Sequence, residues 1–153
     1  MTSLPQPPSG IITGRIHRFA VRAYFEDTDL SGLVYHANYL RWFERARSDF
    51  VRLLGIDQRA ANEAGEGAFA VAELNIRYRV PARLDDAVLI ETVTEEMRAA
   101  SCRMHQRALI GDILLADARL RIGFVAPDGR PRRMPEAWRA AFAPIAPNPE
   151  GSE

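Results

Sequence analysis

Residues 38–54 have the sequence NYLRWFERARSDFVRLL, the one long amphipathic pattern in the chain. Its apolar residues recur every third or fourth position with charged residues between them, as in a helix that buries one face. The apolar positions are Tyr39, Trp42, Phe43, Ala46, Phe50, Leu53 and Leu54. Gly55 follows as a natural stop, because glycine readily adopts the left-handed conformation that ends many helices. We therefore expect a single long helix over residues 38–54.

Several other segments alternate between apolar and polar residues, which is typical of strands. Residues 74–80, LNIRYRV, alternate strictly and end at Pro81, so they indicate a half-buried strand. Comparable segments, separated by short turns, occupy residues 15–25, 87–95, 102–110 and 113–125. One strand, a long helix and four strands predict an α+β fold, with a five-stranded antiparallel sheet wrapped around one long central helix.

The two ends of the chain differ in composition from the middle. Residues 1–14 are rich in proline and lack the apolar stretch of a signal peptide, so we expect a disordered N-terminal extension. Residues 143–153 are expected to form a disordered C-terminal tail. Residues 15–142 then form one domain, which closes with a short helix over residues 135–142.

Composition excludes several classes of function. The 153 residues are 47% hydrophobic and 26% charged, which suits one compact core. Acidic and basic residues number 20 each, so nothing favours nucleic acid as a partner, and no lysine is present for amine chemistry. Cys102 is the only cysteine, and no segment is apolar for the 18 or so residues of an integral membrane segment. We expect a soluble cytoplasmic protein.

The segment between the first strand and the helix has the composition of a site. Residues 26–39, EDTDLSGLVYHANY, place Asp27 and Asp29 just before Gly32 and the start of the helix. Free N–H groups at a helix N-terminus stabilise negative charge. A carboxylate and an oxyanion-stabilising amide are therefore expected to face each other. Only three histidines are present, without ligand-like spacing, so no metal is expected.

The same residues resemble a known family. Residues 24–29, 32–39 and 43–47 are similar to the signature of hotdog-fold acyl-CoA thioesterases of the 4-hydroxybenzoyl-CoA thioesterase type. Within that family the resemblance is closest to the thioesterases associated with the Tol-Pal system. It runs from about residue 19 to about residue 135, and other matching positions are Tyr78, residues 81–86, Met97 and Arg98. It implies hydrolysis of an acyl-CoA substrate to free acid and CoA, without a cofactor.

The resemblance also assigns roles to individual residues. Asp29 stands where the family carries its catalytic carboxylate, which serves as general base or nucleophile. The backbone N–H of His36 fits the group that polarises the thioester carbonyl. Whether the His36 imidazole caps the helix or orients water stays open. For Asp27 we favour a structural role, as a cap of the turn or a partner of an arginine.

Four further residues are candidates for substrate binding. Tyr35 and Gly32 are expected to border the acyl entrance. Arg98 lies in a turn that the family places near the nucleotide of CoA, where a planar guanidinium suits phosphate. Arg83 is a weaker candidate for the same role. A solvated hairpin arginine is the alternative for Arg98, and the sequence favours neither.

Two other functions remain open. Hotdog domains include enoyl-thioester hydratases and dehydratases, and a non-catalytic module that binds acyl-CoA or a protein is also possible. The pair of aspartates before Gly32 favours the thioesterase. A single sheet of this kind leaves an edge unpaired, so we expect a homodimer or homotetramer.

Overall fold

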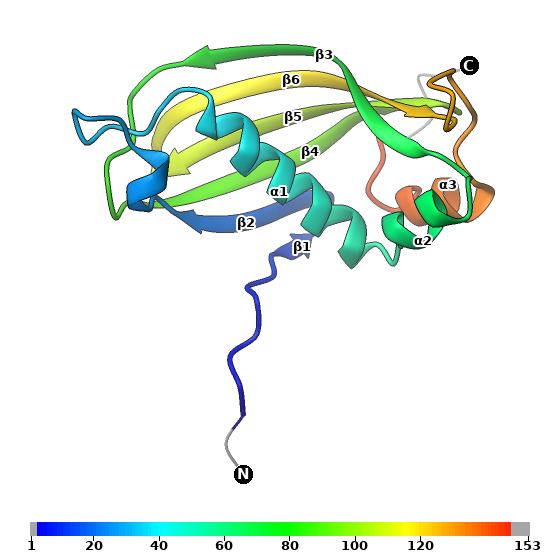
Figure 1. Ribbon diagram of the computed structural model, residues 1–153, viewed down its shortest axis with the longest axis horizontal. Coiled ribbons are helices and arrows are strands. Elements are labelled where there is room, and N and C mark those ends of the chain that lie inside the picture. Colours follow the sequence, from blue (N-terminus) through cyan, green and yellow to red (C-terminus); the bar gives the residue numbers. More distant parts are fainter. Residues whose placement is uncertain (1–2, 148–153) are drawn as a thin grey trace.

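The computed structural model describes residues 3–147, and in this range one antiparallel sheet wraps around a long helix (Figure 1). The strands are β1 (Ile11–Thr13), β2 (Ile16–Arg22), β3 (Ala68–Tyr78), β4 (Ala87–Met97), β5 (Ser101–Ile110) and β6 (Ile113–Val125). The helices are α1 (Asn38–Leu53), α2 (Gln58–Glu63) and α3 (Glu136–Phe142), and Phe25–Asp27 form a 3-10 turn, η1. The α+β fold with a central helix is confirmed, although the described sheet has six strands where five were expected.

The order of strands across the sheet is β1-β2-β4-β5-β6-β3. β3 follows α1 in the chain but lies at the far edge beside β6, from Ala68 opposite Val125 to Tyr78 opposite Ala116. Within residues 3–147 no strand pairs with the outer edge of β3. The opposite edge is β1, which has only three residues. The molecule therefore has one long open edge.

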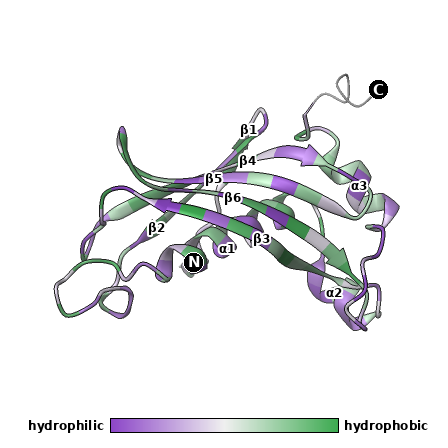
Figure 2. Ribbon diagram, turned by 90° about the horizontal axis from the view of Figure 1, so that it is seen from above, coloured by the Kyte–Doolittle hydropathy of each residue, from purple (hydrophilic) through white to green (hydrophobic). Residues whose placement is uncertain are grey.

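The core lies between α1 and one face of the sheet. Trp42, Phe43 and Phe50 of α1 are at most 1% exposed, as the apolar periodicity of this segment predicts. Along β4, β5 and β6 buried residues alternate with more exposed ones, so one face of the sheet is apolar. Figure 2 shows this alternation in the colours of the strands above α1. Burying each large apolar side chain contributes about 2 to 3 kcal/mol to folding.

Most of the expected elements are confirmed, with shifted ends. α1 ends at Leu53 and Gly55 follows with a φ of 85°, as expected of a stop. The strand expected over residues 74–80 spans Ala68–Tyr78 in the structure. Its first six residues, AFAVAE, were not expected to be part of a strand because they do not alternate between apolar and polar. The short helix α2 was not expected. Its start is capped by Asp57, whose side chain accepts a hydrogen bond from the Ala60 N–H.

The expectation of a disordered extension through residue 14 is wrong for its last part. Ile11–Thr13 pair with β2, and the Ser9 hydroxyl and Gly10 N–H both donate to the Asp49 carboxylate. The expected C-terminal tail is also partly ordered, since Ile145 is buried and its carbonyl accepts a hydrogen bond from Arg15. Residues 1–2 and 148–153 lie outside the described part of the chain. Among the described helices, none has the length and apolar character of a membrane span.

Candidate active site

Asp27 holds the loop between β2 and α1 in shape. Its carboxylate accepts hydrogen bonds from the Tyr24 N–H at 2.8 Å and from the Asn38 side-chain amide at 3.0 Å. The residue is only 7% exposed. Because both oxygens are engaged, Asp27 links η1 to the first residue of α1. This agrees with the structural role that the sequence favours.

Asp29 lies in the same loop but is exposed. One carboxylate oxygen, Oδ1, accepts hydrogen bonds from the Ser31 hydroxyl and from the Ser31 N–H, the latter at 2.8 Å. The hydrogen bonds from Ser31 lower the pKa of Asp29 below its ordinary value. Asp29 is therefore ionised at neutral pH, and Oδ2 accepts no hydrogen bond from residues 3–147. The sequence alone did not indicate that Ser31 supports Asp29.

The loop folds back on itself and is held by the segment before β4. The Asp29 N–H donates to the Leu33 carbonyl at 2.9 Å, and Gly32, with a φ of 79°, makes the turn between them. The Leu84 N–H donates to the Gly32 carbonyl, and Leu33 bridges Arg83. The structure thus places Gly32 in the turn that follows Asp29 and Arg83 beside Leu33 of the same turn. Both contacts are made by the backbone.

His36 stands where this loop enters α1. Neither the His36 N–H nor the Ala37 N–H donates a hydrogen bond within the described residues, and no side chain caps the helix. Tyr78 holds the peptide between His36 and Ala37, because its hydroxyl donates to the His36 carbonyl at 2.9 Å. The Tyr35 ring lies 4.5 Å from the imidazole, between ring centroids. The exposed His36 imidazole has no polar partner among residues 3–147.

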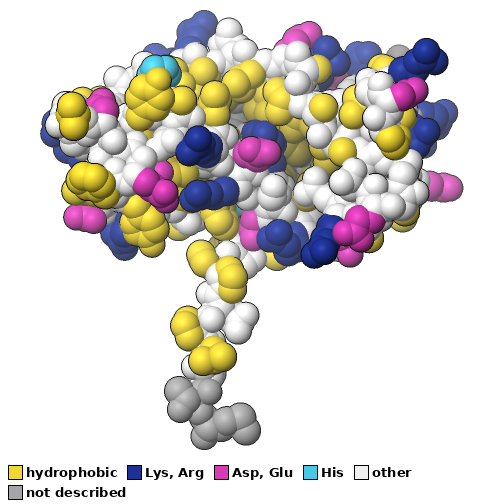
Figure 3. Space-filling model, in the orientation of Figure 1, with side chains coloured by type: hydrophobic (Ala, Val, Ile, Leu, Met, Phe, Trp, Pro, Cys, Tyr) yellow, Lys and Arg dark blue, Asp and Glu magenta, His cyan; other side chains and the backbone are white. Residues whose placement is uncertain are grey.

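Large apolar side chains surround this loop on the surface. Phe25 is 83% exposed, and Tyr24, Leu30 and Tyr35 are also exposed. Figure 3 shows hydrophobic side chains gathered at the end of the molecule that carries the loop. An aliphatic or aromatic group approaching Asp29 would meet them first.

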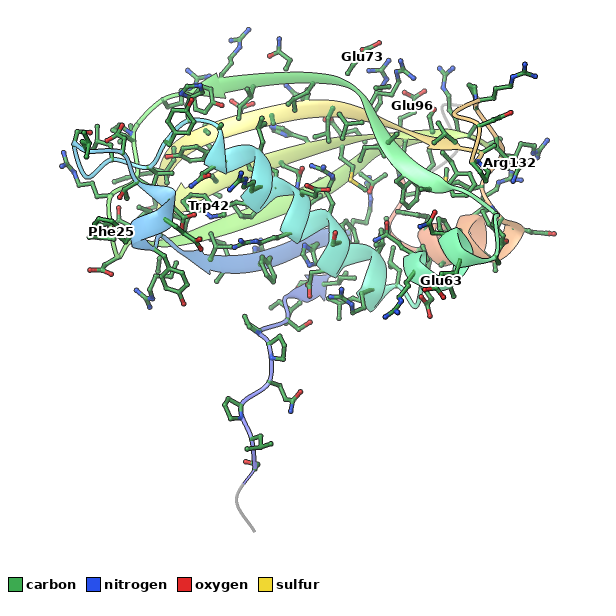
Figure 4. All side chains as sticks on the ribbon, viewed as in Figure 1. Phe25, Trp42, Glu63, Glu73, Glu96 and Arg132 are labelled. Carbon is green, nitrogen blue, oxygen red and sulfur yellow. The ribbon has the colours of Figure 1, made fainter. Side chains whose placement is uncertain are left out.

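Arg98 does not come to Asp29 in a single chain. β4 begins beside the loop, where the Ala23 N–H donates to the Asp86 carbonyl, and its 11 residues span roughly 35 Å. Arg98 follows the far end of β4 and pairs with Glu96 at 2.6 Å. Figure 4 shows Phe25 of η1 and Glu96 toward opposite ends of the sheet. Arg98 therefore lies outside the loop site of its own chain.

A cavity of about 130 Å³ lies between α1 and the first residues of β3, away from the loop. Arg47, which lines it, follows His36 by eleven residues, about 16 Å along a helix. Its apolar wall is formed by Val51, Phe69, Val71, Met104, Ile122 and Phe142. Its polar wall is formed by Glu44, Arg47, Ser48 and Gln58. This cavity could not be predicted from the sequence, because its walls come from six elements that are spread along the chain, namely α1, α2, β3, β5, β6 and α3.

Residues 24–142 match the thioesterase-like superfamily. The chain belongs to this family. It is 39% identical over 125 residues to the acyl-CoA thioesterase YbgC of Haemophilus influenzae, covering 81% of this chain and 92% of that protein. It is 38% identical over 129 residues to the acyl-CoA thioester hydrolase YbgC of Escherichia coli O6:H1, covering 83% and 96%.

Solved structures of the thioesterase family have the same fold. The crystal structure titled "Probable Thioesterase" from Bartonella henselae is 37% identical, with a TM-score of 0.74, covering 78% of this chain and 99% of that one. An Asp-to-Asn variant of 4-hydroxybenzoyl-CoA thioesterase, complexed with 4-hydroxybenzoyl-CoA, is 24% identical, with a TM-score of 0.73 and coverages of 83% and 98%. At that identity the second likeness concerns the fold alone.

Proposed function

We propose that this protein hydrolyses acyl-CoA thioesters to a free carboxylic acid and CoA, with Asp29 as general base or nucleophile. The observation that carries the proposal is the unpaired His36 N–H at the start of α1, at the end of the loop that presents the ionised Asp29. These are the two groups that thioester hydrolysis needs. The relatives named above as acyl-CoA thioesterases support the same reaction.

The chemistry follows from these two groups. As general base, Asp29 takes a proton from water while the water oxygen bonds to the thioester carbon. As nucleophile, its free oxygen attacks that carbon directly, and water later cleaves the anhydride. In both cases the carbonyl oxygen becomes negative and accepts a hydrogen bond from the His36 N–H. The C–S bond then breaks, and CoA leaves as a thiolate. Loss of one such donor typically raises the barrier by about 3 kcal/mol.

The site is completed, in this proposal, by a second copy of the chain. The open edge of β3 can pair with the same edge of a partner in an antiparallel, two-fold arrangement. Tyr78, which holds His36, is at the end of β3, whereas Phe69 and Val71 of the cavity are near its beginning. Antiparallel pairing brings the end of one strand to the beginning of the other. The acyl group would then extend from Asp29 of one chain into the cavity of its partner.

The same arrangement gives Arg98 a place in substrate binding. In a two-fold pair, the Arg98 turn of one chain lies at the same end of the extended sheet as the Asp29 loop of the other. Its exposed guanidinium is then available for the phosphates of CoA. Gly32, Tyr35 and Arg83 border the thioester itself. A homodimer is the minimum assembly, and a homotetramer satisfies the same requirement.

Incubation with acyl-CoA and with enoyl-CoA separates the proposed reaction from its alternatives. The thioesterase releases free thiol from acyl-CoA, whereas a hydratase consumes the enoyl double bond without releasing thiol. A binding module would show saturable binding of CoA and neither reaction.

We also propose a cytoplasmic location for the protein. The free, buried thiol of Cys102 suits such a location, because disulfides are rare there. The closer likeness to the Tol-Pal-associated thioesterases, which the sequence motifs imply, is likewise a proposal.

A further inference from the structure

The cavity between α1 and β3 limits the size of the acyl group that it accepts. Its volume of about 130 Å³ is similar to the roughly 150 Å³ of an engineered cavity that binds benzene. About six non-hydrogen atoms beyond the thioester carbonyl would therefore fill it. On the face shown in Figure 3, hydrophobic side chains are visible between α1 and β3.

Arg47 is an unusual residue for such a cavity, because it forms no ion pair with a carboxylate among residues 3–147. Its guanidinium donates to the side-chain oxygen of Gln106 at 3.0 Å, and no acidic side chain of residues 3–147 lies within 4.0 Å. Burial lowers the pKa of Arg47, and the charge of the neighbouring Glu44 only partly opposes this. A positive charge removed from water without a counter-ion is costly unless a ligand supplies one.

Gln106 is oriented so that it supports Arg47 without cancelling its charge. The residue is 0% exposed, and its side-chain N–H groups donate to the Phe43 carbonyl at 2.9 Å and to the Thr92 hydroxyl at 3.0 Å. Both amide hydrogens are thus used, and the amide oxygen is left to face Arg47. Gln106 therefore fixes the guanidinium beside the cavity as a neutral acceptor.

The other polar groups of the cavity do not provide the missing negative charge. Burial raises the pKa of Cys102 to about 12, so this cavity residue remains a neutral thiol. Ser48 and Gln58 are neutral. Glu44, one turn before Arg47, is exposed at the rim and does not form an ion pair with it within the described chain. The cavity combines an apolar wall with one cation that forms no ion pair within residues 3–147.

We propose that Arg47 binds a carboxylate at the far end of the acyl group, which makes short ω-carboxyacyl-CoA thioesters the preferred substrates. This inference rests on the proposed thioesterase function and names its substrate class. A guanidinium presents paired N–H groups that match the two oxygens of a carboxylate. The methylene groups of the substrate lie against the apolar wall, and the thioester carbonyl stays outside, at Asp29 of the partner chain.

Two substrates of matched shape test the preference. Glutaryl-CoA carries three methylene groups and a carboxylate, and 5-methylhexanoyl-CoA replaces the carboxylate with an isopropyl group of similar size. We expect kcat/KM to be roughly tenfold or more higher for glutaryl-CoA, since a charged hydrogen bond of the usual strength gives at least this factor. Equal values, or a preference for 5-methylhexanoyl-CoA, would overturn the inference while leaving thioester hydrolysis intact.

Matched variants assign the preference to one residue. Arg47→Met keeps an unbranched apolar stem like that of arginine but removes the guanidinium, so the glutaryl to 5-methylhexanoyl ratio of kcat/KM should fall roughly tenfold or more. Arg47→Lys should retain part of the preference. Arg45→Met is the control, because Arg45 is an exposed residue of α1 that does not line the cavity. A ratio that is unchanged in Arg47→Met, or reduced equally in Arg45→Met, counts against the assignment.

Calorimetry with free glutarate and 5-methylhexanoate gives a readout that does not depend on turnover. We expect the wild type to bind glutarate more tightly, and Arg47→Met to lose this difference. Glutarate binding without hydrolysis of either thioester would leave the carboxylate site standing and contradict the proposed function. Hydrolysis of both thioesters without a difference in binding would contradict the carboxylate site alone. The wild-type comparison decides the question even where Arg47→Met does not fold.

Discussion

The Tyr78 hydroxyl donates a 2.9 Å hydrogen bond to the His36 carbonyl, which joins the edge strand β3 to the start of α1. His36, whose N–H donates no hydrogen bond within residues 3–147, is thereby held at its carbonyl by the strand that we expect at the subunit interface. An edge strand thus contacts the residue whose N–H we propose to stabilise the oxyanion.

Replacing Tyr78 with phenylalanine should reduce kcat several-fold, because His36 loses the contact at its carbonyl that restrains the residue and, through it, the orientation of its N–H. Stability should fall by about 1 kcal/mol, the usual contribution of one hydrogen bond. Steady-state kinetics and urea unfolding measure the two effects. Tyr24→Phe is the control, since Tyr24 is exposed and belongs to the same loop. Equal kcat in wild type and Tyr78→Phe would show that this contact does not position the amide.

Replacing Ser31 with alanine should shift the acid limb of the pH-rate profile to higher pH. The hydrogen bonds from Ser31 lower the pKa of Asp29, and the substitution removes the hydroxyl bond while keeping the backbone one. Asp29 must be ionised to act, so activity in the wild type persists below the ordinary pKa of an aspartate and is lost at higher pH in the variant. The profile of kcat/KM reports this pKa in the free enzyme. An acid limb at the same pH in both proteins would exclude Asp29 as the titrating group.

Stability should fall in mild acid because of a buried pair formed by His17 and Asp49. Their side chains are 2.7 Å apart, and burial lowers the pKa of His17 despite the hydrogen bond to Asp49. The unfolded chain therefore binds a proton below about pH 6.5 that the folded chain resists, so stability decreases as the pH falls through this value. Burial alone would raise the pKa of Asp49, but hydrogen bonds from His17, Gly10 and Ser9 lower it, which makes stability fall further in stronger acid.

Urea unfolding between pH 7 and pH 5 measures this dependence. His17→Gln keeps a donor for Asp49 but does not titrate, so its free energy of unfolding should change less over the range. The same slope in His17→Gln would place the titrating group elsewhere.

The fold could be predicted from the sequence where a pattern is local. The period of α1 and the alternation in β4 to β6 depend on one buried face each, and both were found. β1 was not found, because three residues after a proline-rich segment form a strand only by pairing with β2. The placement of β3 at the far edge also depends on the whole sheet and not on its own sequence.

The sequence likewise indicates only part of the arrangement of the candidate site. Asp29, Gly32 and His36 lie within one short segment, so their proximity follows from the loop itself. Arg47 was missed because a helical arginine among charged residues resembles a solvated one. Only the fold shows that Gln106, 59 residues later, is buried against it. Arg98 was assigned to the site without the knowledge that β4 carries it to the other end of the sheet.

Mixing two inactive variants tests whether each site combines two chains. Asp29→Asn removes the acid, and Ala70→Trp fills the cavity that Ala70 lines. If a site takes its acid from one chain and its cavity from the other, a hybrid dimer contains one intact site. After refolding together, the mixture should recover roughly a quarter of wild-type activity, because half of the dimers are hybrids with one of two sites restored. No recovery, with light scattering showing dimers, would mean that acid and cavity act within one chain.

The most direct test of the central claim is the rate of thiol release from acyl-CoA by the wild type and by Asp29→Asn. Asparagine keeps the size of the side chain and an oxygen for the Ser31 hydrogen bonds, but it neither takes up a proton nor attacks as an anion. We predict an intact fold and a fall in kcat of roughly a hundredfold or more, whereas Glu26→Gln, an equal change of charge on an exposed residue of the same loop, retains activity. Thiol release by Asp29→Asn at the wild-type rate would contradict the account.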